Sequence, residues 1–149
     1  MKKLYLHIGT EKTGTTLLQE WLYTNKKNLS KNGIYLPNQL EEPNNILLPT
    51  YFQGHLDDWA WSKRIQNKQE KDIFFEGFLN RVTDEITTAK NNHDTFIITS
   101  EHFHSRLQLI EEIQNLYVFL KSLFDEIYII CYFREQFDTA ISLYSTFLK

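Results

Sequence analysis

Short apolar runs alternate along the chain with longer segments in which apolar residues recur every three or four positions. The short runs predict buried strands at Leu4–Ile8, Ile34–Leu36, Thr95–Thr99 and Glu126–Phe133. The longer segments predict amphipathic helices in residues 15–28, 73–92, 107–120 and 135–148. Residues 38–62 show no clear period, which indicates a long loop with short helical turns.

This order of strands and helices predicts an α/β fold with three layers, α/β/α, around a mostly parallel sheet. No linker or internal repeat divides residues 1–149, so we expect a single domain. Ligands of such sheets bind beyond the carboxyl ends of the strands. Gly9, Ser100 and Arg134 each directly follow a predicted strand and should therefore lie at one edge of the sheet.

Composition and charge narrow the classes of function. The net charge is −3, so the chain has no overall basic field for nucleic acid, and any anion must be held by local donors. No apolar stretch approaches the ~20 residues that span a bilayer, and the run after Lys2 and Lys3 is too short for a signal peptide. We therefore expect a cytoplasmic protein without a membrane span. The single cysteine, Cys131, excludes an internal disulfide and is expected to be a buried, inert thiol.

The segment GTEKTGTT, residues 9–16, lies between the first predicted strand and the first predicted helix. Its glycines allow a tight turn, and the N–H groups of residues 13–16 should point to one anion at the helix start. A Walker A loop has its lysine directly after the second glycine, whereas here position 15 is Thr and the lysine is Lys12. The alternative is an ordinary strand-to-helix turn with an exposed lysine.

This loop, in the context HIGTEKTGTT, resembles the 5′-phosphosulfate loop of sulfotransferases that use 3′-phosphoadenosine 5′-phosphosulfate (PAPS). The form of the loop is most similar to that of bacterial and carbohydrate sulfotransferases. The resemblance implies a P-loop NTPase-like fold, with Lys12 contacting the oxygen between phosphate and sulfate and stabilising the leaving group. The implied contacts to PAPS in this loop come from Gly9, Lys12, Thr13, Gly14, Thr15 and Thr16.

A second anion site is predicted after the last strand. Arg134 lies at the strand end and Ser142 lies two turns into the following helix, so the two side chains can converge on one anion. Taken alone, Arg134 would more often be a surface ion-pair partner. The segment resembles the sulfotransferase 3′-phosphate motif R-[N/E]-P-x-[D/E]-x-x-x-S-x-Y, with Asp138 and Tyr144 also matching and Gln136 replacing the proline. The resemblance implies that Arg134 and Ser142 bind the 3′-phosphate of PAPS.

We expect no metal cofactor. Neither strong downstream strand ends in the aspartate that would hold Mg²⁺ in a phosphoryl-transfer enzyme, and a sulfuryl group is less negative than a phosphoryl group. His102 and His104 could share one face as metal ligands, but no third ligand lies nearby in sequence.

Transfer of a sulfuryl group requires a base for the acceptor's proton. Glu101, at the end of the third strand, is the first candidate, followed by His102 and His104. The alternative is that Glu101 caps the next helix or pairs with Arg106. His7, inside the first strand, is expected to be a packed core histidine.

Recognition of the acceptor is less well defined. Trp59 and Trp61, with Asp57 and Asp58, either form a wall against which a sugar stacks or anchor the irregular segment by packing. Cytosolic relatives often carry an adenine-stacking tryptophan where this chain has Leu17, so that contact is not carried over.

The resemblance predicts a sulfotransferase that moves the sulfuryl group of PAPS to a hydroxyl or amine, with a carbohydrate as the favoured acceptor and 3′-phosphoadenosine 5′-phosphate (PAP) as product. Family domains continue beyond the 3′-phosphate motif, whereas this chain stops at Lys149. We therefore expect a fragment, or a short protein whose site is completed by a partner subunit or a further C-terminal segment, with weak activity alone. The alternatives are a non-catalytic PAPS-binding fragment and a P-loop kinase or NTPase.

Overall fold

Four parallel strands form an open sheet in the computed structural model, which describes residues 1–147. The strands are β1 (Lys3–His7), β2 (Ile34–Tyr35), β3 (Thr95–Thr99) and β4 (Glu126–Ile130), in the order β2-β3-β1-β4. β1 therefore lies between β3 and β4, with His7 in register with Thr99 on one side and with Ile130 on the other. The predicted α/β class with a parallel sheet is confirmed.

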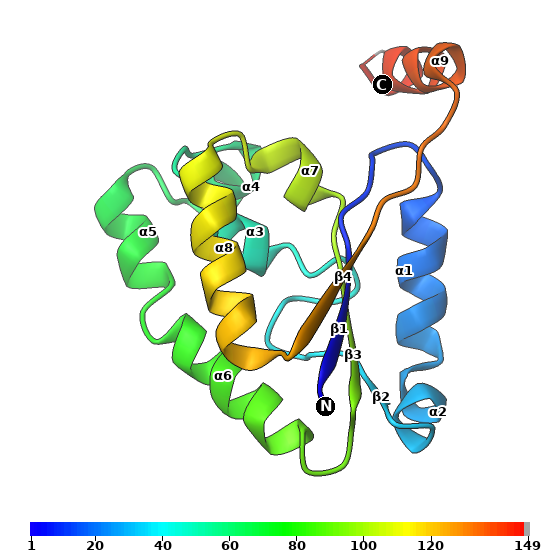
Figure 1. Cartoon of the computed structure of the whole chain (residues 1–149). Coiled ribbons are helices and arrows are strands. Elements are labelled where there is room, and N and C mark those ends of the chain that lie inside the picture. Colours follow the sequence, from blue (N-terminus) through cyan, green and yellow to red (C-terminus); the bar gives the residue numbers. More distant parts are fainter. Residues whose placement is uncertain (148–149) are drawn as a thin grey trace.

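Helices cover both faces of the sheet (Figure 1). On one face lie α1 (Thr15–Thr24) and α2 (Lys26–Lys31), and on the other lie α6 (Phe78–Ala89) and α8 (Ile110–Leu123). The shorter helices on the α8 side are α3 (Leu47–Phe52), α4 (Asp58–Ser62), α5 (Lys68–Phe74) and α7 (His102–Arg106). The last helix, α9 (Gln136–Phe147), stands beyond the carboxyl end of β4, away from both layers (Figure 1).

The main core lies between the central strands and the helices α6 and α8. Alternate residues of β1 and β3 point to this side, and Leu4, Leu6, Phe96 and Ile98 are all buried there. They pack in one cluster with the apolar faces of the two helices, whose buried members include Val82, Ile86, Leu116 and Leu120. Each such side chain contributes about 1.5–3 kcal/mol through removal from water. This packing fixes the central strands whose ends form the site.

Two predicted helices are interrupted in the structure. The segment 73–92 forms α5 and α6, separated by Gly77, whose φ of 68° is left-handed and incompatible with a continuous α-helix. The segment 15–28 forms α1 and α2, which meet at Asn25. The prediction of one continuous helix in each segment was therefore wrong.

The fourth strand ends at Ile130 and not at the predicted Phe133. The next residues nevertheless continue beside the chain after β1, because Tyr132 N–H donates to the Gly9 carbonyl at 2.7 Å. Cys131, in this segment, is partly exposed, so the expectation of a buried thiol was wrong. Arg134 consequently lies on an irregular segment between β4 and α9.

Helix α9 has little apolar packing against the rest of the molecule. Its side chains Phe137, Ile141 and Tyr144 are 69%, 53% and 66% exposed. Among residues 1–147, no helix is both long enough and apolar enough to cross a bilayer.

Candidate anion site at the carboxyl edge of the sheet

The chain segments after β1, β3 and β4 are hydrogen-bonded to one another beyond the ends of the strands. Ile8 N–H donates to the Ile130 carbonyl at 2.9 Å, and Thr10 N–H donates to the Tyr132 carbonyl at 3.0 Å. Ser100 N–H donates to the His7 carbonyl at 2.9 Å, which ties in the segment after β3. The three segments that carry the candidate residues therefore meet at one edge, as predicted.

Both glycines of the Gly9–Thr16 loop adopt backbone conformations that favour glycine. Gly9 has a φ of 106°, and a Cβ there would lie 3.1 Å from Glu101 Cα, so glycine allows the segments after β1 and β3 to approach. Gly14 has a φ of 83°, and a Cβ there would meet nothing within 4 Å. Lys12 is also left-handed, with a φ of 62°, and the Thr13 hydroxyl donates to the Thr10 carbonyl at 2.6 Å. The loop is thus tightly turned but open above Gly14.

Helix α1 begins at this loop without a side-chain cap. The first N–H groups of any α-helix have no intrahelical acceptor. Here the N-cap residue is Gly14, which has no side chain that could accept from them. A cavity of about 240 Å³ adjoins them, lined by Glu11, Lys12, Gly14, Thr15, Thr16 and Glu101. Free N–H groups, the positive end of a helix dipole and an ammonium group at one cavity are the features that bind an anion. The loop residues therefore fit a phosphate- or sulfate-type ligand.

Arg134 links the second predicted motif to this loop. Its Nη1 donates to the Lys12 carbonyl at 3.3 Å, and its Nε lies 3.8 Å from Asp138 Oδ2. Arg134 also lines a second cavity, of about 600 Å³, which shares Glu11 with the first cavity and is walled partly by α9. Ser142 is half-buried on α9 and is not among the residues that line either cavity. The structure thus brings Arg134 to the loop.

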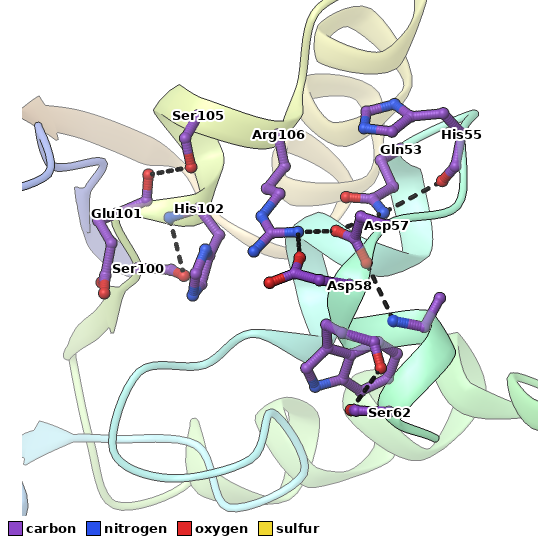
Figure 2. A network of polar contacts seen from close by, with 12 residues as sticks. Gln53, His55, Asp57, Asp58, Ser62, Ser100, Glu101, His102, Ser105 and Arg106 are labelled. Carbon is purple, nitrogen blue, oxygen red and sulfur yellow. Dashed lines mark hydrogen bonds and ion pairs between the residues drawn. The ribbon is translucent and has the colours of Figure 1, made fainter. Parts of the chain in front are cut away.

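Glu101 lines the 240 Å³ cavity together with Lys12. Its Oε2 accepts a hydrogen bond of 2.6 Å from Nε2 of Gln19, a buried residue of α1. Neither alternative for Glu101 is supported, since its side chain makes no cap hydrogen bond to α7 and Arg106 pairs with Asp57 and Asp58 (Figure 2). The sequence analysis did not identify Gln19. The available signal was a polar amide at a position that helical spacing places on the same buried face as Thr15 and Leu22.

The two neighbouring histidines lie in different environments. His102 is half-buried, with its Nε2 3.5 Å from Asn44 Nδ2, and burial lowers its pKa despite the nearby Glu101 carboxylate (Figure 2). His104 instead lines the 600 Å³ cavity near Arg134. Within residues 1–147, no group of three or more His, Cys, Asp or Glu side chains could hold a metal ion.

His7 is buried behind the loop, as predicted. Its Nδ1 is hydrogen-bonded to Thr99 Oγ1 at 2.8 Å, and its ring centre lies 5.1 Å from that of Tyr132. Its Nε2 is buried and has no hydrogen-bond partner among the described residues. Burial lowers the pKa of His7, and the Glu101 carboxylate opposes this effect only in part.

The tryptophan segment is held by structural contacts. Trp59 packs against Phe74 and Phe75, with ring centres 5.7 and 6.3 Å away, so it is a packing anchor. Asp57 caps α4 through the Ala60 N–H and also pairs with Arg106 (Figure 2). Burial raises the pKa of Asp57, but these hydrogen bonds and the Arg106 charge outweigh it and hold the pKa below its usual value. Trp61 alone in this segment presents a largely exposed ring, 63% accessible.

One edge of the sheet therefore combines an uncapped helix start, an ammonium group, a guanidinium group and an oriented carboxylate. Comparison of the chain with protein-family models, with curated proteins and with solved structures found no match.

Proposed function

We propose that this chain binds PAPS on a P-loop NTPase-like fold and transfers its sulfuryl group to an acceptor hydroxyl or amine. The observation that carries the proposal is the hydrogen bond from the Arg134 guanidinium to the Lys12 carbonyl. It joins two segments, 122 residues apart in sequence, each of which is suited to one phosphate of the same nucleotide.

The Gly9–Thr16 loop is suited to the 5′ end of the nucleotide. Its cavity of about 240 Å³ is smaller than the ~300–1,000 Å³ typical of pockets for whole small molecules, so it suits an anionic group. The neighbouring cavity of about 600 Å³, with Arg134 in its wall, offers room for the remainder of the nucleotide. Arg134 is assigned to the 3′-phosphate. The resemblance to the 3′-phosphate motif adds Ser142 of α9 as a second donor, although Ser142 lines neither cavity.

The proposed chemistry needs three groups from the chain. When bound, PAPS supplies an activated sulfuryl group, and its transfer leaves PAP. Lys12 stabilises the negative charge that develops on the leaving phosphate oxygen. Glu101 accepts the proton of the acceptor, a role supported by its place beside Lys12 in the lining of the same cavity. A carbohydrate remains the favoured acceptor, with Trp61 rather than Trp59 available to a sugar ring.

A P-loop kinase is the less favoured function. Position 15 is threonine where a Walker A loop has lysine, and β3 and β4 are followed by Ser100 and Cys131 and not by the aspartate that would hold Mg²⁺.

Calorimetric titration tests the proposal. We expect PAP to bind with the same affinity with and without Mg²⁺, and Arg134→Ala to weaken binding about tenfold or more through loss of a charge-assisted contact. Arg81→Ala is the matched control. Arg81 is exposed and lies on α6, on the other face of the sheet from α1, where its side chain donates to the Glu76 carbonyl (Figure 1). Binding of ATP that requires Mg²⁺, with no binding of PAP, would instead indicate a kinase or NTPase. Binding of PAP without transfer of the sulfuryl group from PAPS to any acceptor would indicate a non-catalytic nucleotide-binding protein.

A further inference from the structure

We propose that Gln19 is a positioning residue, which fixes the Glu101 carboxylate at the loop cavity so that one of its oxygens is directed to the acceptor. This inference rests on the proposed transfer reaction and adds a residue that the sequence motifs do not contain. Gln19 is only 2% exposed, and a buried amide without a partner destabilises a fold. The partner it has is Oε2 of Glu101, at 2.6 Å and 82 residues away in sequence.

Helix α1 couples this contact to the anion-binding loop. Its buried residues Thr15, Gln19 and Leu22 are spaced by four and three positions, so they lie on one face of the helix. Thr15 lines the loop cavity, and Gln19 lies one turn further along. The same rigid helix therefore presents its free N–H groups to the anion and an amide to Glu101.

The hydrogen bond leaves one carboxylate oxygen available. Oε2 accepts from Gln19, whereas Oε1 has no protein donor among residues 1–147. The terminal torsion of a glutamate side chain has broad minima, so without Gln19 the carboxylate would rotate among several orientations. An amide restricts this rotation without adding a positive charge.

Among residues 1–147, no lysine or arginine forms an ion pair with Glu101. Arg106, five residues further along the chain, is held by Asp57 and Asp58 on the opposite side of α7 (Figure 2). A direct ion pair would engage the lone pairs that a base needs, whereas Oε1 accepts no hydrogen bond from the described residues.

In the proposed reaction, the acceptor oxygen forms a bond to sulfur while the bond from sulfur to the phosphate oxygen breaks. The electron pair of that bond stays on the phosphate oxygen beside Lys12, and the acceptor proton moves to Oε1 of Glu101. Gln19 keeps its N–H on Oε2 throughout, so it contributes orientation and takes no part in the bond changes.

Gln19→Met tests the role, because methionine is similarly long and unbranched but donates no hydrogen bond. We expect the Kd of PAP to change less than about twofold, and the kcat for PAPS turnover, with water or a glycan as acceptor, to fall about tenfold at unchanged KM. The double variant Gln19→Met/Glu101→Gln should be no slower than Glu101→Gln alone, since both changes remove one function. Gln69→Met, at an exposed position, is the control.

The contact itself is tested without activity through the side-chain amide NMR signals of Gln19. They should shift on Glu101→Gln and stay unchanged on Glu111→Gln. Additive losses of kcat in the double variant, or an unchanged kcat in Gln19→Met, would overturn the role of Gln19. The proposed function would still stand in that case if the unmodified chain binds PAP and transfers the sulfuryl group. An absence of PAP binding by the unmodified chain would overturn the proposed function, and the role of Gln19 with it.

Discussion

Lys12 has an unusual backbone conformation for its residue type. A lysine with a φ of 62° is held in the left-handed region, which side chains with a Cβ seldom occupy. Its carbonyl accepts a hydrogen bond from the Arg134 guanidinium, and the residue lines the cavity at the start of α1. Lys12 thus connects the loop cavity to Arg134, so one residue would contribute to both proposed phosphate sites.

The buried His7 and the half-buried His102 lead to a separate prediction about stability. Burial lowers the pKa of both His7 and His102, so the folded chain favours their neutral forms. Between the lowered pKa and the unfolded value of about 6.5, the unfolded chain binds more protons. The free energy of unfolding should therefore be fully retained above pH ~6.5 and fall below it, by up to about 1.4 kcal/mol per pH unit for each histidine.

Urea unfolding at pH 7 and pH 5 measures this effect. His7→Asn should flatten the pH dependence, whereas the exposed His55→Asn should keep the wild-type slope. An unchanged slope in His7→Asn would show that His7 does not contribute.

At the scale of elements, α1 and α9 differ sharply in how they are held. α1 inserts the buried side chains of Gln19 and Leu22 beside the sheet, whereas the apolar residues of α9 are largely exposed. Because local stability follows buried contacts, α1 should be a rigid part of the anion site and α9 a more weakly held wall.

Alanine substitutions compare these two helices directly. Leu22→Ala should lower the free energy of unfolding by about 2–5 kcal/mol, as is typical of a buried leucine. Ile141→Ala, on α9, should change it by less than about 0.5 kcal/mol, because the side chain is mostly in water. Chemical denaturation of both variants provides the measurement, and equal losses would contradict this view of α9.

The pattern of apolar residues predicted the buried strands accurately. Thr95–Thr99 was predicted with its observed bounds, and β1 within one residue, because buried strands have a distinct composition. The break at Gly77 was missed because an isolated glycine is tolerated inside a helical pattern. The end of β4 was placed too late because the chain stays apolar and paired with the loop as far as Tyr132.

The position of a candidate residue in the fold was predictable where its motif is local, and its partners were not predictable where they depend on tertiary contacts. The loop glycines and Lys12 could be located because a strand and a helix flank them. The partner of Glu101 could not, because the contact with Gln19 depends on how α1 is rotated against β3. Arg106 was likewise assigned to the wrong carboxylate in one alternative, since its pairing with Asp57 depends on the fold of residues 38–62.

At the scale of the whole molecule, β4 forms one edge of the sheet and presents an apolar surface. Ile129 is 59% exposed and Phe133 is 83% exposed, next to the segment that carries Arg134. The 600 Å³ cavity lies between this segment and α9. Arg134 is therefore exposed, whereas Lys12 and Glu101 are half-buried.

The proposed function depends most on whether Arg134, at this exposed position, recognises the 3′-phosphate of the nucleotide. The most direct measurement is the ratio of affinities for PAP and for adenosine 5′-monophosphate, which lacks the 3′-phosphate, in the unmodified chain and in Arg134→Ala. We predict that the unmodified chain prefers PAP by about tenfold or more, as expected for one charge-assisted phosphate contact, and that Arg134→Ala abolishes this preference. Equal affinities of the unmodified chain for the two nucleotides would contradict the account.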